Sequence, residues 1–210
     1  MVGDGDLMEG ISAEAASLAG HLKLGKLIYL YDSNDISLDG PTDLAFTESV
    51  MKRYESCGWQ VIRVEDGDTD LDAIDAAIAE AKADTNRPTL IEIKTTIGFG
   101  SPNKAGKSAA HGSPLGHDEI QASKSALGWT ETETFAIPGD AAARFAIQAE
   151  HGQAINNEWQ ANFDAWKSAN PQLETTWTHA HDGTLPADWT SKLPQFETGG
   201  SVATRSASGK

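Results

Sequence analysis

Residues 3–40 decide the fold, and they read GDGDLMEGISAEAASLAGHLKLGKLIYLYDSNDISLDG. Gly3-Asp4-Gly5 opens this stretch, and Asn34 follows after a helix-like segment at residues 12–24 and a strand-like segment at residues 27–31. An aspartate at one strand end and an asparagine at the next can hold one hard metal ion, because such ions prefer oxygen ligands. That ion can in turn hold a diphosphate. The stretch therefore predicts a metal–diphosphate site between two parallel strands.

Strand-like and helix-like segments alternate along the first two-thirds of the chain. Buried or alternating apolar residues predict strands, and apolar positions at helical spacing between capping residues predict helices. We expect strands at residues 26–31, 59–64 and 88–96, and helices at residues 13–24, 47–56, 70–83, 118–127 and 140–167. Strands separated by helices of this length indicate crossover connections, so the fold class is α/β with a doubly wound parallel sheet.

Three segments lie outside this alternation. Only Met1 and Val2 precede the GDG motif, so we expect the strand that should end at Asp4 to be missing and a sheet edge to be exposed. Residues 97–118 are rich in glycine and predict a long functional loop. Residues 168–204 show weak periodicity and predict an extended connector without a core of its own.

Composition excludes several partners. The 210 residues carry a formal net charge of −15, which repels nucleic acid and anionic membranes, so neither is an expected partner. A phosphorylated ligand would need a metal, local cations or helix N-termini. No apolar run approaches the length of a membrane span, and the N-terminus does not resemble a signal peptide. The single cysteine, Cys57, permits no intramolecular disulfide and fits a reducing, cytoplasmic location.

The metal ligands can be named from the residues themselves. In an open parallel sheet, ligands bind beyond the carboxyl ends of the strands, which is where Asn34 is expected. The Asp4 carboxylate, the Asn34 side-chain oxygen and the Ile36 carbonyl would suit Mg²⁺, while Gly5 lets the backbone approach a phosphate. The alternative is that GDG is an ordinary turn, as it is in most proteins.

Longer blocks of sequence make the reading more specific. They are GDGDLMEGIS, SLAGHLKLGKLIYLYDSNDISLDG, MKRYESCGW, TTIGFGSPNKAG, HGSPLG and ATRSASGK. Together they closely resemble transketolase, almost without gaps over residues 3–129 and more loosely to residue 210. The resemblance implies a fold of the thiamine-diphosphate-binding type, with thiamine diphosphate and Mg²⁺ as cofactors and Ca²⁺ or Mn²⁺ as substitutes for Mg²⁺.

The resemblance also assigns roles to individual residues. Asp4, Asn34 and the Ile36 carbonyl match the metal ligands, and Gly5 and Asn34 match cofactor contacts. Glu9 matches a cofactor-site glutamate at the subunit interface, although it could be an exposed acid near a helix start.

Three further assignments lie far along the chain. Ile97 matches a residue at the cofactor site. His111 matches a catalytic histidine near the diphosphate and the reacting sugar, where it would bond a substrate hydroxyl and assist proton transfer. Arg205 matches an arginine that grips the substrate phosphate. The alternatives are a histidine capping a turn and an arginine in a disordered tail.

The family implies a particular domain organisation. Residues 1–130 would be a partial diphosphate-binding domain that lacks its N-terminal part, residues 131–204 a connector, and residues 205–210 the start of a pyrimidine-binding domain. The active site of the family forms between the subunits of a homodimer. We therefore expect this chain alone to be inert.

The implied reaction is the transfer of a two-carbon ketol unit between sugar phosphates, in the pentose phosphate pathway and the Calvin cycle. Two alternatives remain open. One is another thiamine enzyme, such as a deoxyxylulose-phosphate synthase or a phosphoketolase, although the HGSPLG and TIGFGSPNKAG blocks favour transketolase. The other is a non-catalytic or partner-dependent half-subunit.

Overall fold

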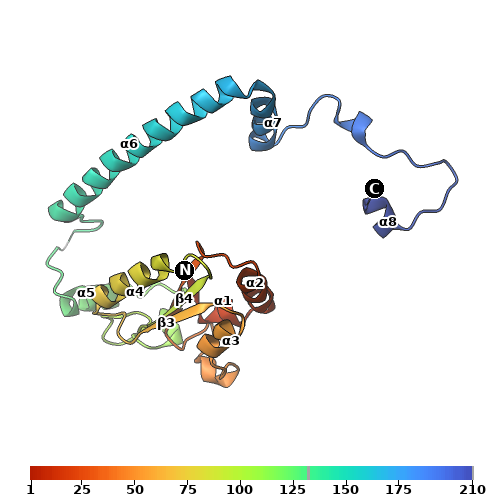
Figure 1. Ribbon diagram of the computed structural model, residues 1–210. Helices are drawn as coiled ribbons and strands as arrows, with labels where there is room; N and C mark the ends of the chain where they lie inside the picture. The colour runs from red at the N-terminus through yellow and green to blue at the C-terminus, as the bar shows by residue number, and fades with distance from the viewer. Residues whose placement is uncertain (132, 210) are drawn as a thin grey trace. The chain divides into compact units, whose positions relative to one another are not determined.

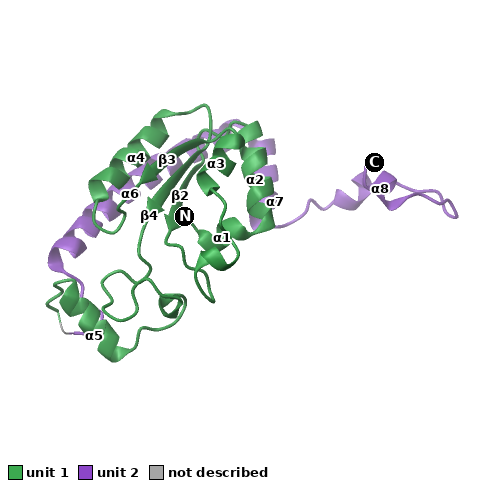
Figure 2. Cartoon of the chain, turned by 90° about the horizontal axis from the view of Figure 1, so that it is seen from below, with its two compact units in different colours: residues 1–132 green, residues 133–210 purple. Residues whose placement is uncertain are grey.

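A computed structural model of the chain describes residues 1–131 and 133–209. The chain divides into two compact units, residues 1–132 and 133–210, which are coloured separately in Figure 2. The first unit contains the sheet and the second contains helices and extended segments.

The sheet of the first unit has four parallel strands in the order β1-β2-β4-β3. The strands are β1 (Val2–Gly3), β2 (Ile28–Ser33), β3 (Gln60–Val64) and β4 (Thr89–Lys94). Figure 1 labels β3 and β4, and Figure 2 shows β2 beside them. Strand β4 is central, and five of its six residues are buried. This is the near-continuous burial expected of a parallel strand covered on both faces.

Helices cover both faces of the sheet. The helices of this unit are α1 (Asp4–Met8), α2 (Gly10–His21), α3 (Val50–Ser56), α4 (Leu71–Ala83) and α5 (His117–Ala126). Figure 2 shows α4 on one side of the sheet and α2 and α3 on the other. Neighbouring residues of β4 contribute to different clusters, Leu90 to the α2–α3 side and Ile91 to the α4 side. The doubly wound α/β prediction is confirmed.

Trp59 lies at the centre of the cluster beneath α2 and α3. Its ring is 2% exposed and lies 5.0 Å from the ring of Tyr29 and 4.9 Å from that of Tyr54, measured between centroids. Its indole N–H donates to the Ala16 carbonyl of α2 at 2.8 Å. Helix α2 lies close to the Cys57 backbone because residue 20 is glycine, where a Cβ atom would sit 1.8 Å from the Cys57 carbonyl oxygen.

Two secondary-structure expectations for the first 60 residues are wrong. The strand before Asp4 is not missing, because Val2 and Gly3 pair in parallel with Tyr31 and Asp32. The helix expected from residue 47 begins at Val50, since the side chain of Ser49 accepts from the Lys52 N–H and caps it.

The second unit contains α6 (Gly139–Ala169), α7 (Pro171–Asp182), a short 3₁₀ helix η3 (Trp189–Lys192) and α8 (Thr204–Ser208). The expectation that residues 168–204 are extended is wrong for α7. This helix starts with Pro171 at its first position and stops at Gly183, whose φ is 65°. Its Trp177 packs on Phe163 and Trp166 of α6. In the described part of the chain, no helix is long and apolar enough to cross a membrane.

Residues 97–116 form the predicted loop, apart from a short 3₁₀ turn, η2 (Ser108–Ala110). Five glycines of this loop have positive φ, a conformation that favours residues without a Cβ atom. The loop follows β4 and so leaves the carboxyl end of the sheet, where Asn34 also lies.

Candidate functional site

Asp4 joins the ends of two neighbouring strands. It directly follows β1, and its side chain is 4% exposed. Its Oδ1 accepts from the Tyr31 hydroxyl at 2.6 Å, and its Oδ2 accepts from the backbone N–H groups of Asn34 and Asp35, both at 3.0 Å. A carboxylate offers about four acceptor positions, so these three bonds leave one free on Oδ1. The geometry suits a ligand that binds a metal through one oxygen.

Tyr31 keeps its proton at this site. Burial is the main cause that raises the pKa of its hydroxyl well above the usual value, and the hydrogen bond to Asp4 adds to it. A hydroxyl that stays protonated can only donate to the carboxylate. Tyr31 therefore acts as a fixed hydrogen-bond donor that orients the Asp4 carboxylate.

Asn34 and Ile36 present two more oxygens just past β2. The Asn34 Oδ1 accepts from the Ile36 N–H at 3.1 Å and keeps a second acceptor position. The Ile36 carbonyl accepts no hydrogen bond in the part of the chain that the structure describes. Carboxylate, amide and carbonyl oxygens together form a donor set that fits Mg²⁺ or Ca²⁺. Within residues 1–131 and 133–209, no group of three or more His, Cys, Asp or Glu side chains could hold a metal ion. Any site here thus depends on the amide and carbonyl oxygens.

A cavity of about 380 Å³ gathers most of the predicted site residues. It lies at the carboxyl ends of β1 and β2 and is also reached by the loop after β4. Its lining residues are Gly3, Asp4, Gly5, Asp6, Asp32, Asn34, Ile36, Ser37, Leu38, Ile97 and His111. The fold thus brings His111 and Ile97 close to Asp4 and Asn34, although they are far from both in sequence.

His111 lines this cavity directly after η2. Its Nδ1 is buried and has no hydrogen-bond partner within the described residues. An unsatisfied buried nitrogen is costly, so it normally has a partner when the site is in use. A bound ligand with a polar group near Nδ1 would supply that partner.

The charge of the cavity selects what can enter. Asp4, Asp6 and Asp32 contribute carboxylates, whereas the described lining residues include no lysine or arginine. A free diphosphate would be repelled, but a diphosphate carrying a divalent cation would not. The residues present therefore fit a metal–diphosphate pair better than either an anion alone or a neutral ligand.

Three predicted residues differ in where the structure places them. Gly5 lines the cavity, and a Cβ atom built there would meet no protein atom within 4 Å, so the space beside it is open. Glu9 is exposed at the junction of α1 and α2 and is not a lining residue. Arg205 belongs to α8 of the second unit. The roles assigned to all three stay predictions.

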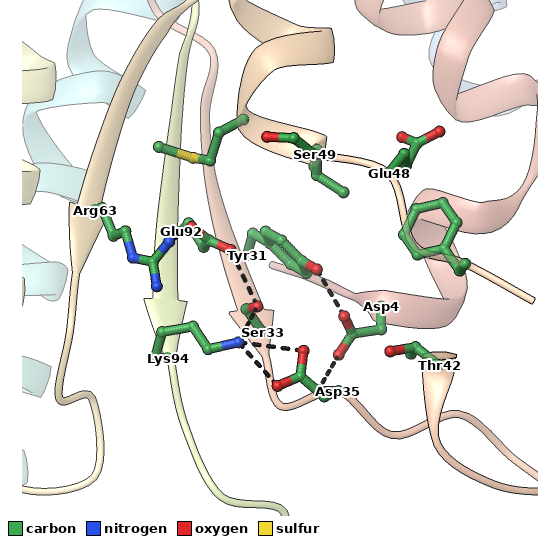
Figure 3. A pocket seen from close by; sticks show the side chains of 13 residues that line it. Asp4, Tyr31, Ser33, Asp35, Thr42, Glu48, Ser49, Arg63, Glu92 and Lys94 are labelled. Atoms are coloured by element: carbon green, nitrogen blue, oxygen red, sulfur yellow. Dashed lines mark hydrogen bonds and ion pairs between the residues drawn. The ribbon is translucent and has the colours of Figure 1, made fainter. Parts of the chain in front are cut away.

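A second cavity, of about 270 Å³, also includes Asp4 in its wall. Figure 3 shows its polar side chains, among which Lys94 forms an ion pair with Asp35. Neither Tyr31 nor the Lys94–Asp35 pair was expected from the sequence. The only available signal was the alternation of β2, which puts Tyr31 and Ser33 on the same face of the sheet.

Comparisons with known proteins agree with a diphosphate-binding site. Residues 1–186 match the family described as "Transketolase, thiamine diphosphate binding domain". The chain is 55% identical over 208 residues to the transketolase of Halalkalibacterium halodurans, covering 99% of this chain and 31% of that protein. It is 51% identical over 209 residues to the transketolase of Bacillus subtilis, again covering 99% of this chain and 31% of the relative.

Solved structures agree in fold. A crystal structure of Pichia stipitis transketolase in complex with sedoheptulose-7-phosphate matches with a TM-score of 0.83 at 46% identity, covering 97% of this chain and 30% of that chain. Transketolase from Leishmania mexicana matches with a TM-score of 0.83 at 41% identity, covering 93% of this chain and 29% of that one. The chain thus spans about a third of the length of the relatives it matches.

Proposed function

The chain belongs to the transketolase family, and we propose that it forms the diphosphate-binding part of an enzyme that transfers a two-carbon ketol unit between sugar phosphates. The proposed donors are xylulose 5-phosphate and sedoheptulose 7-phosphate, and the proposed acceptors are ribose 5-phosphate and glyceraldehyde 3-phosphate. This reaction belongs to the pentose phosphate pathway and the Calvin cycle.

One observation carries the proposal. The cavity at the carboxyl ends of β1 and β2 joins the oxygens of Asp4, Asn34 and Ile36 to the unpartnered ring nitrogen of His111. Its acidic lining accepts a diphosphate only together with a cation. This is the combination that thiamine diphosphate and a divalent metal require.

The residues divide the work as follows. Asp4, Asn34 and the Ile36 carbonyl would hold Mg²⁺, with Ca²⁺ or Mn²⁺ as substitutes, and Gly5 would leave room for the diphosphate. When bound, thiamine diphosphate supplies the electron sink for breaking and forming the carbon–carbon bond. Ile97 would cover an apolar part of the cofactor. His111 would hold a substrate hydroxyl and move its proton.

The remaining parts of the proposal concern assembly. We place the chain within a longer protein that acts as a homodimer in the cytoplasm, where the free thiol of Cys57 would stay reduced. Glu9 would lie at the subunit interface and Arg205 would grip the substrate phosphate. We keep the division into a diphosphate-binding part at residues 1–130, a connector at 131–204 and the start of a pyrimidine-binding domain at 205–210.

The test is a chimaeric enzyme. Residues 1–210 replace the matching third of Bacillus subtilis transketolase, and ketol transfer from xylulose 5-phosphate to ribose 5-phosphate is measured in a coupled assay. We expect turnover, and we expect Asp4→Ala to lower kcat/KM by at least about 100-fold because a metal ligand is lost. Asp75→Ala, at an exposed position on α4, is the matched control and should leave turnover unchanged.

The 210-residue chain on its own, without the rest of the enzyme, provides a second experiment. We expect it to bind Mn²⁺ in the presence of thiamine diphosphate but to show no turnover. A chimaera that folds and binds both cofactors yet fails to transfer ketol units would contradict the proposed reaction. Absence of Mn²⁺ binding in both proteins would contradict the metal site itself.

A further inference from the structure

Asp35 adopts an unusual backbone conformation between two proposed metal ligands. Its φ is 61°, in the left-handed region that non-glycine residues rarely occupy. Asn34 precedes it and Ile36 follows it, so this one torsion sets how the amide oxygen and the carbonyl oxygen are presented. Aspartate tolerates the region better than most residues, but it does so only where other contacts hold it.

Three groups of Asp35 are held at once. Its N–H donates to the Oδ2 of Asp4 at 3.0 Å, and its carbonyl accepts from the Thr42 N–H at 2.9 Å. Its carboxylate accepts from the Lys94 ammonium group, with Nζ 3.0 Å from Oδ2 and 3.2 Å from Oδ1 (Figure 3). Of these three contacts, only the last is made by a residue of the sheet, since Lys94 belongs to β4.

Lys94 is itself fixed in place. It ends β4 opposite Ser33 in the sheet register, and its Nζ also donates to the Ser33 hydroxyl at 3.1 Å. That hydroxyl in turn donates to the Oε1 of Glu92 at 3.2 Å. The Lys94 side chain is 27% exposed and that of Asp35 is 71% exposed, so the sheet limits the freedom of the lysine although the carboxylate it holds faces solvent.

We propose that Lys94 is a positioning residue for the metal–diphosphate site, which it serves by clamping Asp35 in its left-handed conformation. The clamp keeps the turn from Asn34 to Ile36 against Asp4, so that all three oxygen ligands face one cavity. This inference rests on the proposed metal-binding function. Lys94 itself does not line the cavity that would hold the metal.

Charge alone predicts the opposite effect of removing the lysine. Without its positive charge, the nearby acids would attract a cation more strongly, so metal affinity would rise. If Lys94 acts as a clamp, its removal releases Asp35 and metal affinity falls. The sign of the change therefore distinguishes a positioning role from simple electrostatics.

A double-mutant cycle on the 210-residue chain measures this sign. Mn²⁺ is titrated, with thiamine diphosphate present, into the unmodified chain, K94M, D35G and K94M/D35G, and free Mn²⁺ is followed by electron paramagnetic resonance. We expect K94M to weaken Mn²⁺ binding by about tenfold, the size typical of groups that orient metal ligands. In the D35G background, K94M should add no loss, because glycine adopts the left-handed conformation without a clamp.

K52M is the matched control. It removes one positive charge from an exposed position on α3, and it should leave Mn²⁺ affinity unchanged. Equal or tighter binding by K94M, or equal losses in both backgrounds, would overturn the proposal.

Amide hydrogen exchange tests the clamp without any metal. In the metal-free chain, K94M should speed exchange of the Asn34 and Asp35 amides, which donate to Asp4, by about tenfold. The same substitution should have no effect on these amides in D35G. Unchanged exchange overturns the clamp even if the metal binds. Failure of the unmodified chain to bind Mn²⁺ leaves the proposed function to be decided by the chimaera and the clamp to be decided by the exchange result.

Discussion

The two units of the chain use apolar residues in different ways. Every buried hydrophobic side chain within the described residues lies in the first unit, from Leu7 to Ile93. The second unit contains large apolar residues as well, but none of its described residues is buried. Helix α6 has 31 residues and no buried side chain, whereas α4 has 13 residues and buries Ala77 and Ala81.

The difference shows how a sheet helps a unit to bury apolar side chains. Parallel strands offer two broad faces, so short helices with small residues can bury their inner side against them. In the second unit, α6 packs against α7 instead, where the rings of Phe163 and Trp166 meet Trp177. We therefore expect changes in the first unit to affect stability strongly and equivalent changes in the second to affect it weakly.

The largest expected effect comes from replacing matched tryptophans. Trp59→Ala should lower the free energy of unfolding of the first unit by about 3–5 kcal/mol, because it empties the centre of an aromatic cluster and removes the hydrogen bond to the Ala16 carbonyl. Trp177→Ala should cost less than about 1 kcal/mol, since this side chain is 46% exposed. Urea unfolding followed by circular dichroism compares the two. Equal losses would remove the distinction between the units.

Smaller effects on stability are expected from replacing two helix glycines by alanine, and the two effects should have opposite signs. Gly20→Ala should destabilise the chain by about 1–3 kcal/mol, because the new methyl group would meet the Cys57 carbonyl at 1.8 Å. Gly152→Ala on α6 meets nothing within 4 Å and should stabilise that helix by about 0.5–1 kcal/mol. Melting temperatures of both variants provide the measurement, and two shifts of the same sign would contradict the comparison.

The smallest effect concerns α5, a helix of the first unit that buries no residue. Glu119 ties it to the loop after β4 by accepting from the Ser101 hydroxyl and from the backbone and side-chain N–H groups of Asn103, at 2.8 and 2.9 Å. These bonds, that from Ser101 first, lower the pKa of Glu119 from 4.5 to about 2. A lowered folded-state pKa means that the stabilisation is present above pH 4.5 and is lost as the pH falls toward 2.

Nuclear magnetic resonance can follow this loss through the Asn103 amide. Its chemical shift should stay constant down to about pH 3 and then change with a midpoint near pH 2, which is the folded-state pKa of Glu119. In Glu119→Gln, the change over this range should disappear. A midpoint near the ordinary glutamate value would show that these bonds do not persist in solution.

The sequence predicted the first unit better than the second. Alternating and helical periodicity gave all three long strands and the helices between them, because each element buries a regular face. The strand before Asp4 was missed because two residues show no periodicity, although they suffice to pair with β2. Helix α7 was missed because its several threonines have a low helix propensity, although Pro171 at its first position and Gly183 after its last mark its two ends.

The candidate site, too, could be predicted only in part from the sequence. The spacing from Asp4 to Asn34 pointed to a metal site, but His111 and Ile97 came only from the resemblance, since a long loop brings them to the cavity. The Lys94–Asp35 pair had no signal at all. It depends on the register that places Lys94 beside Ser33 and on a positive φ at an aspartate.

The strand order has a consequence for how the chain acquires its shape during synthesis. Strands β2 and β3 leave the ribosome before β4, yet they do not pair with each other, since each bonds to β4. The sheet therefore stays open until Lys94 has emerged, and the contacts that close it span long stretches of chain. Such non-local pairing slows folding and prolongs the exposure of unpaired strands. Strand β4 is central in the sheet but late in the sequence. The unit is therefore most exposed to aggregation, and most dependent on chaperones, in the interval between the synthesis of β3 and that of β4.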